Sequence, residues 1–301
     1  MLDSYVGIDG GGSKTQVVIL QGANVIADFR RGGSYLPQIG VHAFLKLFQD
    51  IHQQLGYYCD RKSIKALVIG LPGYGATSNW KKELDEHMAK VFSGYIYDIY
   101  NDVELAREAA FNLAPGILAL SGTGSMIWAK GSRGQRLTVG GWGHLFGDEG
   151  SGYAIGLRGL QLASHSHDGR ISPSSLPEAI IKHFKLTSLW EVLDILYAKQ
   201  DKRSEIAALS YLVAQEAEKG DKAAQQIIHE ASHRLIEQIG IAHQRLGENL
   251  PVACVGGMFK LSTYHQQVGV GIAQLGLKEV VASSTSPALG AAKLAVRLGA
   301  N

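Results

Sequence analysis

The sequence predicts an α/β protein with two domains, and three observations support this fold class. The chain has 301 residues, which is enough for two domains of ordinary size, each with its own core. Segments with strand and helix patterns alternate, as in sheets covered by helices. A strand, a glycine-rich loop and a returning strand open the chain, and the same pattern recurs in altered form near residue 117. This internal duplication predicts one such hairpin at the start of each half.

The first hairpin is predicted from two short apolar runs, residues 5–8 and 17–20, on either side of three consecutive glycines. Consecutive glycines let the main chain approach a ligand and direct several N–H groups at one anion. An ordinary turn needs no such run, so we expect a phosphate-binding loop. Its predicted residues are Gly10, Gly11, Gly12, Ser13, Lys14 and Thr15.

Two better-known nucleotide motifs do not fit this loop. A P-loop places its lysine directly after the last glycine, whereas Ser13 intervenes here, and a strand follows where a P-loop has a helix. The dinucleotide-binding fingerprint also requires a helix at that point. The loop therefore belongs to neither type.

The rest of the first half is predicted as a third antiparallel strand followed by alternating helices and strands. The last of these strands delivers Asn101 and Asp102 into the start of a helix. The expected elements are strand 25–29, helix 41–55, strand 65–71, helix 78–91, strand 95–100 and the helix after residue 101.

The second half is expected to begin after Pro115 and Gly116 with the altered hairpin, whose loop is Ser121, Gly122, Thr123, Gly124 and Ser125. A polar turn and a glycine-rich segment then lead into a helix. The later elements are helix 153–163, a helical region 174–248, strand 252–255 ending at Gly256 and Gly257, and a last helix that starts near Pro287.

Composition excludes several classes of function. The formal net charge is +2, from 29 basic and 27 acidic residues, and no basic run stands out, so we expect neither a nucleic-acid nor a membrane-surface partner. Apolar runs are too short for a membrane span or a signal peptide, which predicts a cytoplasmic protein.

The cysteines and histidines give no metal motif. Cys59 and Cys254 are far apart and form no C-x-x-C pair, which argues against a disulfide framework, a structural zinc site and an iron–sulfur cluster. Both are expected to be packing residues. His165 and His167 have no third ligand nearby in the sequence, and we expect them in a surface loop.

Taken together, the motifs resemble the sugar kinase/actin/heat-shock ATPase superfamily, in particular the branch of N-acetylglucosamine kinases and BadF/BadG-type ATPases. The resemblance covers nearly the whole chain and rests on the segments 9–15, 101–102, 121–125, 141–151 and 256–259. It implies two ribonuclease-H-like (actin-like ATPase) domains, with ATP in a cleft between them. The implied domains are residues 1–115 with 287–301, and residues 116–286 with a helical insertion.

The resemblance also implies roles for two aspartates. Asp102 matches the catalytic general base that takes the proton of a sugar hydroxyl; the alternative is that it only caps the following helix. Asp9 is expected to bind Mg²⁺, because hard cations favour carboxylates; the alternative is a turn-forming aspartate.

Further residues are assigned to nucleotide and sugar in the same way. With the first loop, Gly122, Thr123, Gly124, Gly256 and Gly257 are expected to bind ATP. The expected sugar-binding residues are Tyr35, Asp102, Thr123, Gly141, Trp142 and Asp148. Alternatives remain for three residues: Trp142 as core, and Asp148 and Ser151 as caps of the next helix. Tyr35 stands about where the family's amino-sugar kinases commonly have an asparagine.

The resulting hypothesis is an ATP- and Mg²⁺-dependent kinase for a hydroxyl of an amino sugar such as N-acetylglucosamine or glucosamine, with the 6-hydroxyl as the expected position. Its partner would be a small sugar, and the resemblance allows a homodimer. One alternative is a BadF-type ATPase activator of a dehydratase, against which the isolated cysteines count. The other is a non-catalytic sugar or nucleotide sensor.

Overall fold

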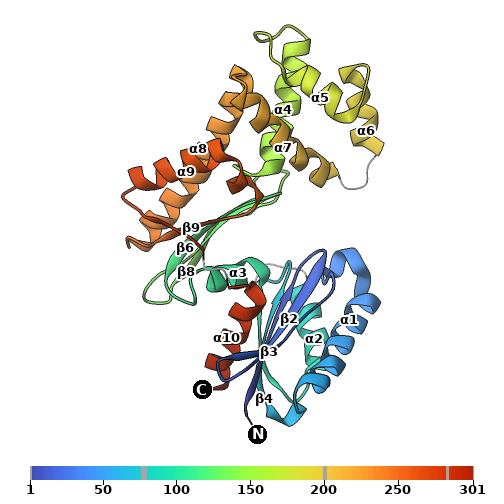
Figure 1. Cartoon of the computed structure of the whole chain (residues 1–301), viewed down its shortest axis with the longest axis vertical. Helices are drawn as coiled ribbons and strands as arrows, with labels where there is room; N and C mark the ends of the chain where they lie inside the picture. Colours follow the sequence, from blue (N-terminus) through green and yellow to red (C-terminus); the bar gives the residue numbers. More distant parts are fainter. Residues whose placement is uncertain (1, 76–79, 199–201, 283–284, 301) are drawn as a thin grey trace. The chain divides into compact units, whose positions relative to one another are not determined.

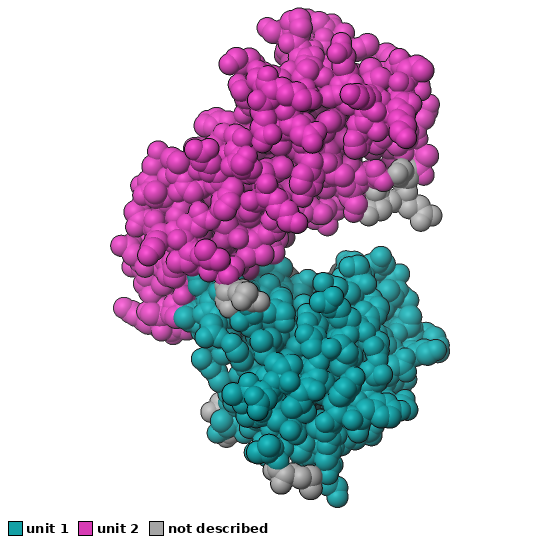
Figure 2. All heavy atoms as spheres, in the orientation of Figure 1, with its two compact units in different colours: residues 1–114, 283–301 teal, residues 115–282 magenta. Residues whose placement is uncertain are grey.

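The structure is a computed structural model, which describes residues 2–75, 80–198, 202–282 and 285–300. The chain divides into two compact units, coloured separately in Figure 2. Unit 1 contains residues 1–114 and 283–301, and unit 2 contains residues 115–282. The assignment of these two units as functional domains stays a prediction.

Unit 1 is built on a five-stranded mixed sheet with the order β3-β2-β1-β4-β5. Strands β1, β2 and β3 form an antiparallel meander, and β4 and β5 then add in parallel to β1. The strand bounds are β1 Ser4–Gly10, β2 Lys14–Gln21, β3 Asn24–Gly32, β4 Ile64–Leu71 and β5 Ile96–Asn101.

Helices cover both faces of this sheet (Figure 1). On one face α1 (Leu36–Tyr58) and α2 (Lys81–Val91) bury Phe44, Phe48 and Met88 against the strands. On the other face lie α3 (Asp102–Ala110) and α10 (Pro287–Gly299), whose small alanines pack closely on the strands. Unit 1 is thus a three-layer α/β unit that the C-terminal helix completes.

Unit 2 repeats the same plan, because its sheet has the order β8-β7-β6-β9-β10. Strands β6, β7 and β8 are antiparallel, and β9 and β10 are parallel to β6. Each strand therefore has a counterpart in unit 1, which confirms the internal duplication predicted from the two hairpins. The bounds are β6 Gly116–Ser121, β7 Ser125–Lys130, β8 Arg136–Gly140, β9 Val252–Val255 and β10 Glu279–Val280.

The helices of unit 2 pack with its sheet in one large hydrophobic core. Residues of β6 and β7, such as Ile117 and Ile127, pack with Ile155 of α4 and with Leu235 and Ile239 of α8. The helix bounds are α4 Gly152–His167, α5 Leu176–Phe184, α6 Val192–Ala198, α7 Lys202–Glu218, α8 Lys222–Leu246 and α9 Ser262–Gln274. No helix in the described ranges is both long enough and apolar enough to cross a membrane.

Most predicted elements are confirmed, and the fold class is confirmed with them. Among the strands and α-helices of the described residues, β8, α9 and β10 were not predicted. The expected surface loop at His165 and His167 is wrong, because both residues lie in the last turn of α4. Residues 78 and 79 of the expected helix 78–91 lie outside the described residues.

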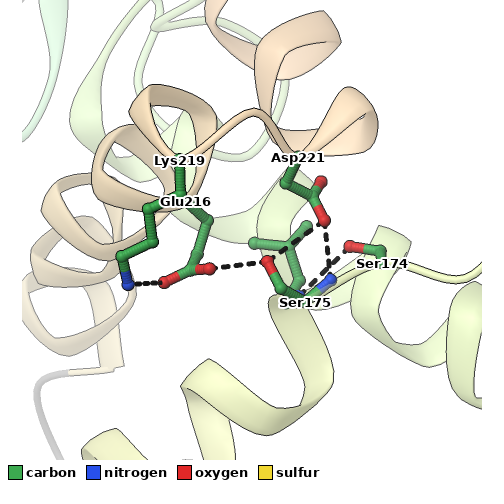
Figure 3. Close-up of polar contacts among 6 residues, drawn as sticks. Ser174, Ser175, Glu216, Lys219 and Asp221 are labelled. Atoms are coloured by element: carbon green, nitrogen blue, oxygen red, sulfur yellow. Dashed lines mark hydrogen bonds and ion pairs between the residues drawn. The ribbon is translucent and has the colours of Figure 1, made fainter.

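A cluster of polar side chains fastens α5 to the turn between α7 and α8 (Figure 3). One carboxylate oxygen of Asp221 accepts from the backbone N–H of Ser175 at 2.6 Å, and the other accepts from the N–H of Ala224 at 2.8 Å. Asp221 is therefore the N-cap of α8 and also a partner of α5. The Ser175 hydroxyl lies 2.5 Å from Glu216, which also pairs with Lys219 at 2.6 Å.

We expect Asp221→Ala to lower the free energy of unfolding by about 1–3 kcal/mol, because it removes a helix cap and the hydrogen bonds to Ser175. Asp221→Asn is the matched control, since it keeps an acceptor for the cap, and it should cost less. Urea unfolding at neutral pH measures both. Equal stability of Asp221→Ala and the wild type would contradict this role.

The same cluster predicts a loss of stability in acid. Burial acts to raise the pKa of Asp221, but hydrogen bonds from the N–H groups of Ala224 and Ser175 outweigh it, so this pKa is lowered. A lowered folded-state pKa stabilises the fold above the unfolded-state pKa, and this contribution is lost as pH falls through the folded-state value. The difference between wild type and Asp221→Ala should therefore shrink in acid.

Candidate functional site

In unit 1 the strand register brings the two predicted aspartates together. Asp9 is paired with Gly70 on the parallel strand β4, and Gly70 is paired with Tyr100 on β5. Strands β1 and β5 flank β4 in the parallel part of the sheet, so Asp9 near the end of β1 and Asp102 directly after β5 lie at the same edge, where open α/β sheets bind their ligands. Gly70 adds no side chain between them. The negative charge of Asp102 acts on Asp9, consistent with this proximity.

Asn101, and not Asp102, is the N-cap of α3. The side chain of Asn101 accepts from the N–H of Val103 at 2.9 Å and donates to the Tyr74 carbonyl at 2.8 Å. Asp102 is the first helical residue, and one of its oxygens also lies 3.0 Å from the N–H of Val103. The alternative that Asp102 serves as the cap is therefore wrong, because its neighbour fills that position.

Both carboxyl groups have raised pKa values. Burial is the main cause for Asp9, the charge of Asp102 adds to it, and Lys14 partly offsets it, which together raise the pKa of Asp9 to about 7. Burial also raises the pKa of Asp102, although hydrogen bonds from the backbone at residues 102 and 103 act against it. A raised pKa strengthens a carboxylate as a base.

The loop between β1 and β2, which was predicted to bind phosphate, packs against the segment after β3. The N–H of Ser34 donates to the Gly11 carbonyl at 2.9 Å, and a Cβ on Gly33 would lie 2.1 Å from the Gly12 carbonyl oxygen. The hydroxyl of Thr15 donates its hydrogen bond to the Gly32 carbonyl at 2.8 Å and so does not donate to a ligand in this arrangement. Within the described part of the chain, the Ser34 hydroxyl is buried beside Gly10 without a hydrogen-bond partner.

In unit 2 the loop between β6 and β7 is fastened to the start of α4. Gly152 donates its N–H to the Gly122 carbonyl at 2.7 Å, and the Ser121 hydroxyl donates to Gly150 at 2.8 Å. Ser151 caps α4 through the N–H of Ala154, as the alternative for Ser151 proposed. The start of the loop is thus attached to the start of α4.

A cavity of about 410 Å³ lies beside this loop, and several predicted ATP-binding residues line it. Gly122, Thr123 and Gly257 form one side, and Ser204, Ala208 and Tyr211 of α7 contribute to the other. The backbone at Gly256 has a φ of 124°, which disfavours any side chain. A Cβ there would also lie 2.1 Å from the Ser121 carbonyl oxygen.

Asp148 is buried and forms an ion pair with Arg203. Its carboxylate accepts from Arg203 Nη2 at 2.8 Å, and it lies directly against Gly124. The alternative of Asp148 as a helix cap is wrong, because Ser151 is the cap. The alternative of Trp142 as a core residue is also wrong, since its side chain is 71 % exposed. Gly141 precedes it and packs on Met126.

The structure adds three residues that the sequence did not single out. Ser34 lies under the first loop, and Arg203 and Tyr211 of α7 approach the second. No sequence signal pointed to Arg203, because 55 positions separate it from Asp148. Tyr35, which was predicted to meet the sugar, is exposed directly before α1 and lies near Gly73.

The residues present fit a divalent cation and a nucleotide. The half-buried carboxyl group of Asp9, whose pKa is raised by burial and by the charge of Asp102, is a suitable donor for Mg²⁺. The unpartnered Ser34 hydroxyl and the exposed backbone of residues 12–14 fit phosphate oxygens.

Comparison with known proteins defines the class. The profile of the BadF/BadG/BcrA/BcrD ATPase family matches residues 6–295, so the chain belongs to this family, as its motifs predicted. It is 32 % identical over 237 residues to an N-acetylmuramic acid/N-acetylglucosamine kinase of Clostridium acetobutylicum, covering 76 % of each protein. It is 24 % identical over 275 residues to an N-acetyl-D-glucosamine kinase of Dictyostelium discoideum, covering 84 % of each.

Solved structures agree with this assignment. A protein of Chromobacterium violaceum, described as a candidate N-acetylglucosamine kinase, superimposes with a TM-score of 0.74 at 26 % identity, covering 97 % of this chain and 99 % of that one. A ROK hexokinase from Thermus thermophilus has a TM-score of 0.60 at 14 % identity, covering 98 % and 99 %, and shares the fold. The predicted actin-like ATPase fold is therefore confirmed.

Proposed function

We propose that this protein is an ATP-dependent amino-sugar kinase that transfers the γ-phosphoryl group to the 6-hydroxyl of N-acetylglucosamine, glucosamine or a close relative. The observation that carries the proposal is the placement of Asp9 and Asp102 at the carboxyl ends of β1 and β5, the two strands that flank β4, with Asn101 capping α3 in place of Asp102. The kinase activities named for two relatives, at 32 % and 24 % identity, support it.

In the proposed reaction Asp102 accepts the proton of the sugar hydroxyl as its oxygen attacks phosphorus. Burial raises the pKa of Asp102, so its carboxylate is a better base than an exposed aspartate. Asp9 would hold Mg²⁺, which supplies neutralisation of phosphate charge. The backbone N–H groups of residues 10–15 and 122–124 would orient the phosphates.

The cavity beside Gly257 would take the adenosine part of ATP, with Tyr211 at its side. Asp148 would accept hydrogen bonds from sugar hydroxyls, held in place by Arg203, and Thr123, Gly141, Trp142 and Tyr35 would contact the sugar. A phenol at Tyr35 offers different hydrogen bonding from an amide, which bears on the choice of sugar.

A coupled assay of ADP release tests the proposal over glucosamine, N-acetylglucosamine, N-acetylmuramic acid, glucose and mannose. At least one amino sugar should raise ADP release far above the basal rate, whereas glucose and mannose should raise it less. ADP release that no sugar increases would instead favour an ATPase.

We expect Asp148→Asn to raise the KM for the sugar roughly 10–100-fold, because hydrogen bonds to a charged acceptor contribute about 1.5–3 kcal/mol. The KM for ATP should stay unchanged. Initial rates with the sugar varied at saturating ATP measure this effect. Asp168→Asn is the control, since Asp168 is exposed at the other end of α4. An unchanged sugar KM in Asp148→Asn would remove Asp148 from the sugar site.

A further inference from the structure

Three side chains with metal-binding atoms meet at one edge of the unit 2 sheet. Cys254 lies near the end of β9, His265 is in the first turn of α9, and Glu279 is on the edge strand β10. One ligand atom from each lies within 4.8 Å of the others. No role in the proposed phosphoryl transfer involves these residues.

The three side chains contact one another directly. His265 Nε2 lies 2.6 Å from Glu279 Oε1, and the Cys254 sulfur lies within 4.8 Å of both groups. Burial and the charge of Glu279 raise the pKa of the thiol. Metal binding would therefore form an S–metal bond and release the thiol proton to solvent.

The ligand types favour zinc over the harder cations. A thiolate and an imidazole are typical ligands of Zn²⁺, whereas Mg²⁺ prefers oxygen. In a tetrahedral Zn²⁺ site with bonds of about 2.0–2.3 Å, the ligand atoms lie roughly 3.3–3.6 Å apart. The present separations are within 4.8 Å, so small side-chain shifts would suffice.

The surroundings fit three protein ligands and one water. The ring of Phe259 lies edge-on to His265, with 5.5 Å between centroids, and restricts the imidazole. The side chains of His265 and Glu279 are 42 % and 30 % exposed, which leaves room for a water as the fourth ligand. The three ligands come from different elements, so a metal would cross-link β9, α9 and β10.

We propose that Cys254, His265 and Glu279 form a binding site for Zn²⁺. Cys254 lies two residues before Gly256. A bound ion would therefore fix the end of β9, from which the chain enters the loop at Gly256 and Gly257. The proposal of a zinc site rests on the geometry of these three residues and does not depend on the proposed kinase activity. In the sequence the ligands are 11 and 14 positions apart, which matches no short zinc motif.

Cobalt(II) substitution of the full-length protein tests the site directly. Protein stripped with a chelator and titrated with Co²⁺ should develop a sulfur-to-cobalt charge-transfer band that saturates at one equivalent and disappears on addition of Zn²⁺. Cys254→Ser should abolish this band, and His265→Gln and Glu279→Gln should weaken binding at least about tenfold. The control is Cys59→Ser, which changes the buried cysteine of unit 1 and should leave the band intact.

Thermal unfolding provides a second readout without a chromophore. Zn²⁺ should raise the melting temperature of the wild type and of Cys59→Ser, but not that of Cys254→Ser. Absence of the charge-transfer band in folded wild-type protein would overturn the proposal. A band that persists in Cys254→Ser and is lost in Cys59→Ser would place the metal elsewhere and overturn it as well.

Discussion

Asp102→Asn is expected to lower kcat by about 10²–10⁴-fold, because an amide cannot accept the proton of the attacking hydroxyl. Affinity for ATP should change little, since Asp102 is assigned to the acceptor and not to the nucleotide. The substitution preserves the size of the side chain, and Asn101 remains to cap α3, so the fold should persist. Steady-state rates together with nucleotide binding by calorimetry separate the two effects.

Asp98→Asn is the matched control for this experiment. Asp98 lies on the same strand β5, but its side chain is exposed, and its oxygen contacts only the neighbouring N–H of Ile99 among the contacts described. It should keep wild-type kcat. If Asp102→Asn retained kcat within a few-fold of the wild type, another group would have to be the base.

Asp9→Asn is expected to have two opposite effects: loss of Mg²⁺-dependent activity and a gain in stability without metal. Burial and the charge of Asp102 raise the pKa of Asp9 from 3.8 to about 7. A folded-state pKa above the unfolded-state value means that stability is fully present below the unfolded pKa. It is then lost as pH rises through the folded pKa. Asparagine does not ionise, so it removes this loss.

The gain in stability of Asp9→Asn should be at most about 4 kcal/mol above pH 7 and should disappear in acid. Urea unfolding of both proteins in chelator, above and below the pKa of Asp9, measures this difference. Adding Mg²⁺ and ATP should stabilise the wild type more than the variant. A variant less stable than the wild type at every pH would show that burial of the ionised Asp9 carboxylate does not destabilise the fold.

The two hairpins could be predicted because their signals are local. The glycine run at residues 10–12 and the Ser-Gly-Thr-Gly-Ser loop at 121–125 each stand between apolar runs, and a turn of that composition fixes the strands around it. The elements that were missed lack such a signal. β10 is only two residues long, and Gly269 and Gly271 dilute the helical pattern of α9.

The candidate site could be predicted only where its residues stand at the ends of recognisable strands. Asp9 and Asp102 each end a recognisable strand, and parallel strands align their carboxyl ends, so their meeting follows from topology. Arg203 reaches Asp148 from a helix of the insertion, and its position depends on how α7 packs on α4. The cluster of Cys254 and His265 likewise depends on tertiary packing of α9 against the sheet edge.

Phosphorus NMR of a completed reaction with ATP, Mg²⁺ and N-acetylglucosamine or glucosamine tests the central claim most directly. The account predicts that ADP and a sugar phosphomonoester form in equal amounts, with the phosphorus coupled to the protons on C6. Release of inorganic phosphate alone, with no phosphorylated sugar from either amino sugar, would contradict it.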